Sequence, residues 1–145
     1  LHLSLRRQRQ MCIRDRNIEI IKEEKILDKV KSKTAPYLKK EWLKLADHPL
    51  VGEARIKGLM GAIELCANKE TRERFSSEGR FTSLDEISAG SLCRDLSINN
   101  GLVMRAVGDT MIIAPPLIIN QEQIDELISK ATKTLDDTLA AINKT

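Results

Sequence analysis

Apolar residues recur at helical spacing through residues 17–45, with lysine and glutamate at most of the other positions. This pattern predicts an amphipathic helix. Pro36 interrupts it and predicts a kink or a helix in two pieces, with Thr34 as the cap of the second piece. The segment Asp47-His48-Pro49 ends the helix, and His48 is expected in a loop that leads towards a strand.

A short apolar run at residues 59–65 predicts a buried strand between Gly58 and Asn68. Gly58-Leu59-Met60-Gly61 also matches the GxxG loop of KH domains, which joins two helices and contacts nucleic acid. Here the two central residues are apolar and lie in a strand pattern, so we reject that interpretation. Residues 68–75 predict a short polar helix, and residues 76–82 a loop.

Ser83-Leu84-Asp85-Glu86 has the form of a capping box, in which the serine and glutamate side chains satisfy backbone N–H groups at a helix start. A helix is expected from there to Asn100, with Gly101 in a left-handed cap. Residues 102–107 and 110–114 are apolar and flank Gly108-Asp109. A glycine-first pair suits a type II′ turn, which predicts a β-hairpin.

Pro115-Pro116 closes the hairpin, and Asn120 with Gln123 predicts the start of a last, long helix. Its apolar stripe consists of Ile124, Leu127, Ile128, Ala131, Leu135, Leu139 and Ile142. The fold class expected is α+β. It is a two-layer domain whose small, mainly antiparallel sheet (59–65, 102–107 and 110–114) is covered by helices.

The composition describes a globular domain: 41% of the 145 residues are hydrophobic and 31% are charged. No apolar run approaches the roughly 20 residues that span a bilayer, so no membrane partner is expected. The net charge of +3 is the sum of +4 in residues 1–16, which hold five arginines and one aspartate, and −1 in the rest of the chain. With only 3% aromatic residues, no nucleic-acid partner is expected either.

Residues 1–16 fit neither a signal peptide nor a typical transit peptide. The segment RRQRQMCIRDR resembles a translated sequencing adapter, so we expect residues 1–16 to be a non-native or disordered arm. The natural chain would then continue upstream. An RNA-binding arm is the alternative, because arginine-rich segments fold on nucleic acid.

Catalytic and metal-binding patterns are missing from the sequence. Cys12, Cys66 and Cys93 form no CxxC pair, which favours reduced thiols in a cytoplasmic protein, with Cys66 and Cys93 in the core. His2 and His48 have no partners at metal-ligand spacing. We find no phosphate-binding glycine loop, no GxSxG and no HExxH motif.

Arg105 stands out because it interrupts the apolar segment Leu102–Val107. It either points to solvent, the commoner arrangement for arginine, or binds an anion. In the second case its planar guanidinium would hold a carboxylate through two hydrogen bonds.

Two segments, His48–Leu65 and Gly101–Leu117 with the helix that follows, resemble the C-terminal small domain of class III pyridoxal-phosphate aminotransferases. The resemblance is strongest to the ω-transaminase group of amine–pyruvate and putrescine–pyruvate type. It covers residues 17–145 in unbroken order, with 17–45 as the helix that leads from a large domain.

The resemblance implies that Arg105, in the Arg-x-x-Gly segment that ends at Gly108, is the mobile arginine that receives the carboxylate of the amino acceptor. It implies a cytoplasmic homodimer that transfers an amino group from a primary amine to a keto acid such as pyruvate. Pyridoxal 5'-phosphate and the Schiff-base lysine would belong to the large domain, whose motifs do not occur here. This chain would then contain no catalytic residue and be inactive alone.

Two alternatives remain at this point. The chain could be a stand-alone α+β ligand-binding or regulatory module with Arg105 as an anion anchor. It could also be an RNA-binding protein that uses its arginine-rich arm.

Overall fold

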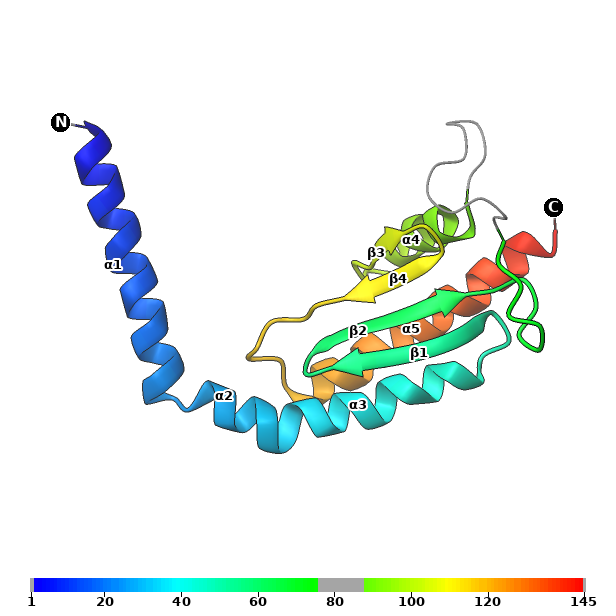
Figure 1. The fold of residues 1–145 in the computed structure, drawn as a ribbon, viewed down its shortest axis with the longest axis horizontal. Helices are drawn as coiled ribbons and strands as arrows, with labels where there is room; N and C mark the ends of the chain where they lie inside the picture. Colours follow the sequence, from blue (N-terminus) through cyan, green and yellow to red (C-terminus); the bar gives the residue numbers. More distant parts are fainter. Residues whose placement is uncertain (1, 76–87, 145) are drawn as a thin grey trace.

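The computed structural model describes residues 2–75 and 88–144. Helical segments and strands follow one another along the chain as Figure 1 shows. They are α1 (His2–Glu23), α2 (Ile26–Lys29), a π-helical segment (Val30–Thr34), α3 (Ala35–Leu43), a 3-10 segment (Lys44–Asp47), β1 (Val51–Lys57), β2 (Met60–Leu65), α4 (Ala89–Asn99), β3 (Arg105–Val107), β4 (Thr110–Ile113) and α5 (Gln121–Ile142).

The four strands form one antiparallel sheet in the order β1-β2-β4-β3. Helix α3 packs against β1 and α5, and α4 packs against α5 and the β3–β4 hairpin. Figure 1 shows α5 behind the sheet, so that α3, α4 and α5 form one layer and the sheet the other. The core between them includes Trp42, Ile63, Leu65, Met111 and Leu135. The predicted two-layer α+β fold with a long C-terminal helix is confirmed.

Strands β1 and β2 form a hairpin whose two-residue turn is Gly58-Leu59, since Lys57 pairs with Met60. Gly58 has a φ of 60°, which favours glycine. The sequence analysis assigned no strand to residues 51–57, although their buried and exposed positions largely alternate as expected of a strand. The GxxG segment therefore lies on a hairpin rather than between two helices, which confirms its rejection as a KH loop.

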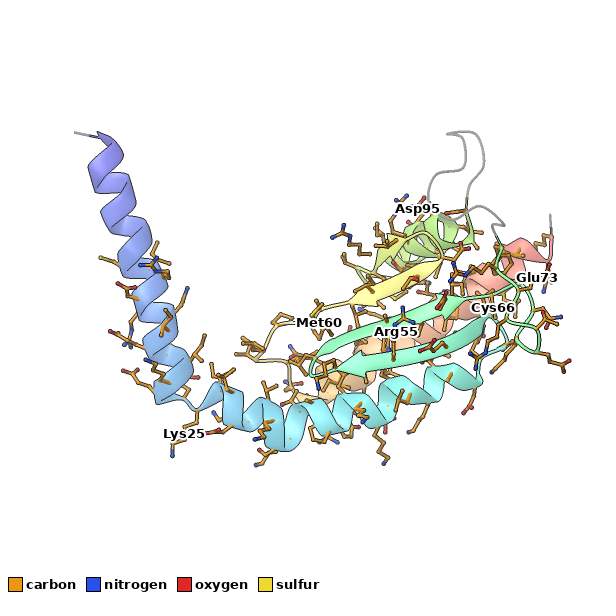
Figure 2. All side chains as sticks on the ribbon, viewed as in Figure 1. Lys25, Arg55, Met60, Cys66, Glu73 and Asp95 are labelled. Atoms are coloured by element: carbon orange, nitrogen blue, oxygen red, sulfur yellow. The ribbon has the colours of Figure 1, made fainter. Side chains whose placement is uncertain are left out.

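The first helical region differs from its prediction. It breaks at Lys25, whose φ of 52° is left-handed, rather than at Pro36 (Figure 2). Pro36 lies in the first turn of α3, directly after the π-helical turn, and the chain stays helical through it. Thr34 is helical and its side chain caps nothing, because the widened π-helical turn leads directly into α3.

The helix predicted at residues 68–75 is also wrong. Asn68 and Glu73 form an isolated antiparallel bridge around a turn. The Asn68 side chain accepts hydrogen bonds from the backbone N–H groups of Glu70 (2.9 Å) and Thr71 (3.1 Å). An asparagine that binds its own backbone in this way stabilises a turn in place of a helix.

The predicted capping box at residues 83–86 lies outside the described residues. Helix α4 begins at Ala89 with Ser88 as its N-cap, and Gly101 after it has the expected left-handed φ of 72°. At the start of α5, the side chains of Asn120 and Gln123 form the capping box that the sequence predicts.

The β3–β4 hairpin has the predicted two-residue turn, since Val107 pairs with Thr110 around Gly108-Asp109. Its strands are shorter than predicted. Strand β3 begins at Arg105 rather than at residue 102, and β4 ends at Ile113. The chain before β3 is held instead by the Met104 side chain, which is buried in the core.

Residues 2–16 form the first part of helix α1. The side chains of residues 12–19 are exposed, and Figure 1 shows α1 extending away from the sheet and its helices. That residues 1–16 are foreign to the natural protein stays a prediction.

Candidate functional site

Arg105 lies on the outermost strand of the sheet, opposite Ile112 of β4. Its side chain is exposed, and among the described residues it forms no hydrogen bond or ion pair. The residues before and after Arg105 in the chain, Met104 and Ala106, are apolar. The guanidinium is thus available to an anion from outside the described residues.

Register places four residues in one row across the exposed face of the sheet: Arg55, Ala62, Ile112 and Arg105. The two arginines occupy the two edge strands, about 14 Å apart at three strand spacings. The row between them is apolar. The sequence analysis did not identify Arg55, because only the pairing of strands far apart in the chain brings it into line with Arg105.

The two arginines differ in their partners. Arg55 contacts the carboxylates of Glu53 (3.5 Å) and Glu64 (3.4 Å), and Glu64 also contacts Arg74 (3.0 Å). Figure 2 shows Arg55 on the sheet face formed by β1 and β2. Since its charge is already balanced, Arg55 is a weaker candidate for anion binding than Arg105.

The histidine and cysteines of the domain are structural. His48 accepts a hydrogen bond from the Leu50 N–H at Nδ1 (3.1 Å), and its Nε2 lies 3.2 Å from an Asp136 oxygen. Both ring nitrogens are therefore occupied. Cys66 and Cys93 are buried as predicted, and burial raises the pKa of both thiols, which disfavours the reactive thiolate.

A hollow of about 670 Å³ lies where β4 leads into α5. Its lining is mainly apolar and includes Val103, Pro116 and Ile118. The two polar residues in it, Asn120 and Gln123, already bind each other's backbone in the capping box. The hollow is thus mainly apolar, and the side-chain oxygens of its two polar residues are already engaged.

The described residues contain no group of three or more histidine, cysteine, aspartate or glutamate residues able to hold a metal ion. In the same residues, no helix combines the length and apolar character needed to cross a bilayer.

Comparison with known proteins decides the family. The class-III aminotransferase family model matches residues 9–135. The chain belongs to the class-III aminotransferase family. Over 126 residues it is 59% identical to the putrescine–pyruvate aminotransferase of Pseudomonas aeruginosa, a match that covers 87% of this chain and 26% of that enzyme.

More distant relatives agree with this assignment. Gamma aminobutyrate transaminase 1 of Solanum lycopersicum, a mitochondrial protein, is 31% identical over 121 residues, which cover 83% of this chain and 22% of that protein. A solved transaminase with L-alanine superposes with a TM-score of 0.77 at 32% identity, covering 88% of this chain and 28% of that one. The ω-transaminase of Pseudomonas jessenii in complex with PMP gives a TM-score of 0.74 at 28% identity, covering 88% and 26%.

The chain spans about a quarter of the length of the curated relatives it matches. Class-III aminotransferases use pyridoxal phosphate, which a lysine holds as a Schiff base. Every lysine is exposed except the half-buried Lys130, which pairs with Glu126 at 2.6 Å. Lys31, Lys39 and Lys57 border surface hollows but are exposed, so no lysine lies in the enclosed setting that favours a Schiff base.

Proposed function

We propose that this chain is the acceptor-binding, C-terminal part of an ω-type transaminase. The complete enzyme transfers an amino group from a primary amine to a keto acid, with pyruvate as the acceptor. Identity of 59% to a putrescine–pyruvate aminotransferase supports a primary amine as the donor and pyruvate as the acceptor. The match to the class-III aminotransferase family supports amino-group transfer as the reaction.

Exposed Arg105, without a partner among the described residues, is the observation that carries the proposal. A guanidinium presents its N–H groups in a planar fork that matches a carboxylate. Because no carboxylate among the described residues holds it, the side chain can turn towards an acceptor and turn away when an amine without a carboxylate takes its place.

The rest of the enzyme supplies what this chain lacks. A large domain carrying the Schiff-base lysine holds pyridoxal phosphate, and the present chain orients the acceptor against it. We further propose that the complete enzyme is a cytoplasmic homodimer and acts without nucleic-acid or membrane partners. Alone, residues 1–145 would be inactive.

The test replaces Arg105 in the full-length enzyme. A hydrogen bond to a charged group contributes roughly 1.5–3 kcal/mol, and 1.36 kcal/mol corresponds to a factor of about ten in rate. Arg105→Ala is therefore expected to lower kcat/KM for pyruvate about 10- to 100-fold. Arg105→Lys recovers part of the loss, because an ammonium lacks the fork.

Two further substrates serve as controls. The half-reaction with an amine donor that carries no carboxylate proceeds unchanged in Arg105→Ala, and so does transfer to an uncharged aldehyde. Equal losses towards pyruvate and towards the aldehyde would assign Arg105 a structural role and contradict the proposal.

A further inference from the structure

The turn that follows Arg105 is held from two sides. The backbone oxygen of Asp109 accepts a hydrogen bond from the N–H of Leu65 at the end of β2 (2.9 Å). The side chain of Asp109 accepts another from the N–H of Gly90, in the first turn of α4 (3.3 Å). One residue thus joins the hairpin to the sheet and to the start of a helix.

The contact between α4 and this turn leaves no room for a side chain at position 90. A Cβ atom on Gly90 would overlap the carbonyl oxygen of Gly108 and lie 3.2 Å from the Cα of Asp109. These are backbone atoms, which cannot turn aside as the end of a flexible side chain can. Any residue other than glycine must therefore push the hairpin and the helix apart.

The same hairpin carries Arg105, three residues before Gly108. Among the described strands, β3 pairs with β4 alone, so the sheet fixes its position weakly. At the start of the strand, Met104 is 1% exposed and anchored in the core. At the other end, the contact with α4 holds the turn. The backbone of Arg105 is thus fixed between two anchors, while its side chain is exposed.

We propose that Gly90 and Asp109 are positioning residues for Arg105. Close packing of Gly90 on Gly108, together with the hydrogen bond to Asp109, sets where the guanidinium meets the acceptor carboxylate. This inference rests on the proposed role of Arg105. In this inference Gly90 and Asp109 contact neither substrate nor cofactor. They act by holding the backbone that carries Arg105.

Gly90→Ala in the full-length enzyme tests the close contact. A misplacement of about 1 Å can cost about 100-fold in rate, so we expect kcat/KM for pyruvate to fall about 10- to 100-fold, mainly through KM. The half-reaction with a carboxylate-free amine stays at its original rate. Ser91→Ala, at the next position of α4, is the matched control and leaves the pyruvate KM unchanged. An unchanged pyruvate KM in folded Gly90→Ala would overturn the inference.

Asp109 provides a second test that adds no bulk and so decides the matter if Gly90→Ala fails to fold. Asp109→Ala removes the acceptor for the Gly90 N–H and is expected to raise the pyruvate KM. Asp109→Asn keeps an oxygen at that position and restores most of the affinity. If neither substitution changes the pyruvate KM, or both slow the amine half-reaction equally, the two residues do not act through Arg105.

A double substitution separates this inference from the proposed function. If Gly90 acts through Arg105, Gly90→Ala causes no further loss towards pyruvate in an enzyme that already carries Arg105→Ala. Independent, additive losses would overturn the positioning role and leave the role of Arg105 intact. An Arg105→Ala enzyme with normal pyruvate kinetics would instead contradict the proposed function itself.

Discussion

The hydroxyl of Tyr37 donates a hydrogen bond of 2.6 Å to the carboxylate of Asp125 and so ties α3 to α5. The two residues are 88 positions apart in the chain. This hydrogen bond raises the pKa of Tyr37 above its ordinary value of 10.0, because loss of the phenolic proton would place two negative charges together.

This hydrogen bond predicts that the folded state loses stability at alkaline pH. A raised pKa means that the folded state holds the proton more tightly than the unfolded state. The stability it contributes is complete below the ordinary pKa and is lost as pH rises through the raised value. Tyr37 is the only tyrosine in the chain, so the absorbance of tyrosinate reports it alone.

Titration of the folded chain should therefore place tyrosinate formation at higher pH than in denaturant. Asp125→Asn removes the negative charge and should move the transition back towards the ordinary value. A transition at the same pH in folded and denatured chain would contradict the hydrogen bond.

Gly61 is expected to be intolerant of a larger residue. A Cβ atom there would lie 2.8 Å from the Cε2 of Trp42 and 3.0 Å from the Cγ1 of Ile113. Trp42 is completely buried, so its ring has little room to move. Overpacking of this kind costs about 1–3 kcal/mol, and we expect Gly61→Ala to lower the free energy of unfolding by that amount.

Urea unfolding followed by the fluorescence of Trp42, the single tryptophan, measures the change. Met60→Ala on the same strand is the control, because Met60 is 63% exposed and its loss should cost no more than about 0.5 kcal/mol. A Gly61→Ala chain as stable as the original would show that the core relaxes around the added methyl group.

Features set by neighbouring residues were predictable from the sequence. Gly108-Asp109 specifies a two-residue turn, and that turn alone places Arg105 opposite Ile112, as found. Asn120 and Gln123 likewise specify the start of α5 within four residues. In each case the chemistry that decides the structure lies within a few residues of the feature.

Features that depend on distant parts of the chain were not predictable. The packing of Gly90 on the hairpin joins residues 19 positions apart, and nothing near Gly90 in the sequence indicates it. The alignment of Arg55 with Arg105 requires the register of three strand pairs. Strand β1 was missed for a different reason: Gly52 and a bulge after Val51 weaken its alternation.

Removal of residues 1–16 should leave the domain unchanged. Among the described side chains, the first buried one is Ile26, and residues 12–19 are all exposed. Because surface groups of this kind contribute little, the truncated chain should melt at nearly the same temperature as the full chain and lose only the helical signal of the removed turns.

The arm also permits a direct test of the RNA-binding alternative. Five arginines in residues 1–16 would give an affinity for RNA that falls steeply with added salt. We expect no such binding in the full chain. Salt-sensitive binding that disappears on truncation would show that residues 1–16 bind RNA. A large drop in melting temperature on truncation would show that they stabilise the fold.

The isolated chain should not hold pyridoxal phosphate in a specific, stoichiometric way. Its lysines are exposed, including Lys31, Lys39 and Lys57 beside surface hollows, or half-buried and paired with Glu126, as Lys130 is. No lysine therefore has the desolvated setting that favours covalent capture. Mixed with the cofactor, it should show only the weak, lysine-dependent absorbance change that any protein with exposed lysines gives. It should form no alanine from pyruvate and an amine.

The full-length enzyme is the positive control. Stoichiometric cofactor binding with turnover by residues 1–145 would refute the proposal that a large domain holds the cofactor while this chain binds the acceptor. Specific binding of pyruvate without turnover, lost in Arg105→Ala, would instead support a ligand-binding module that uses the same arginine.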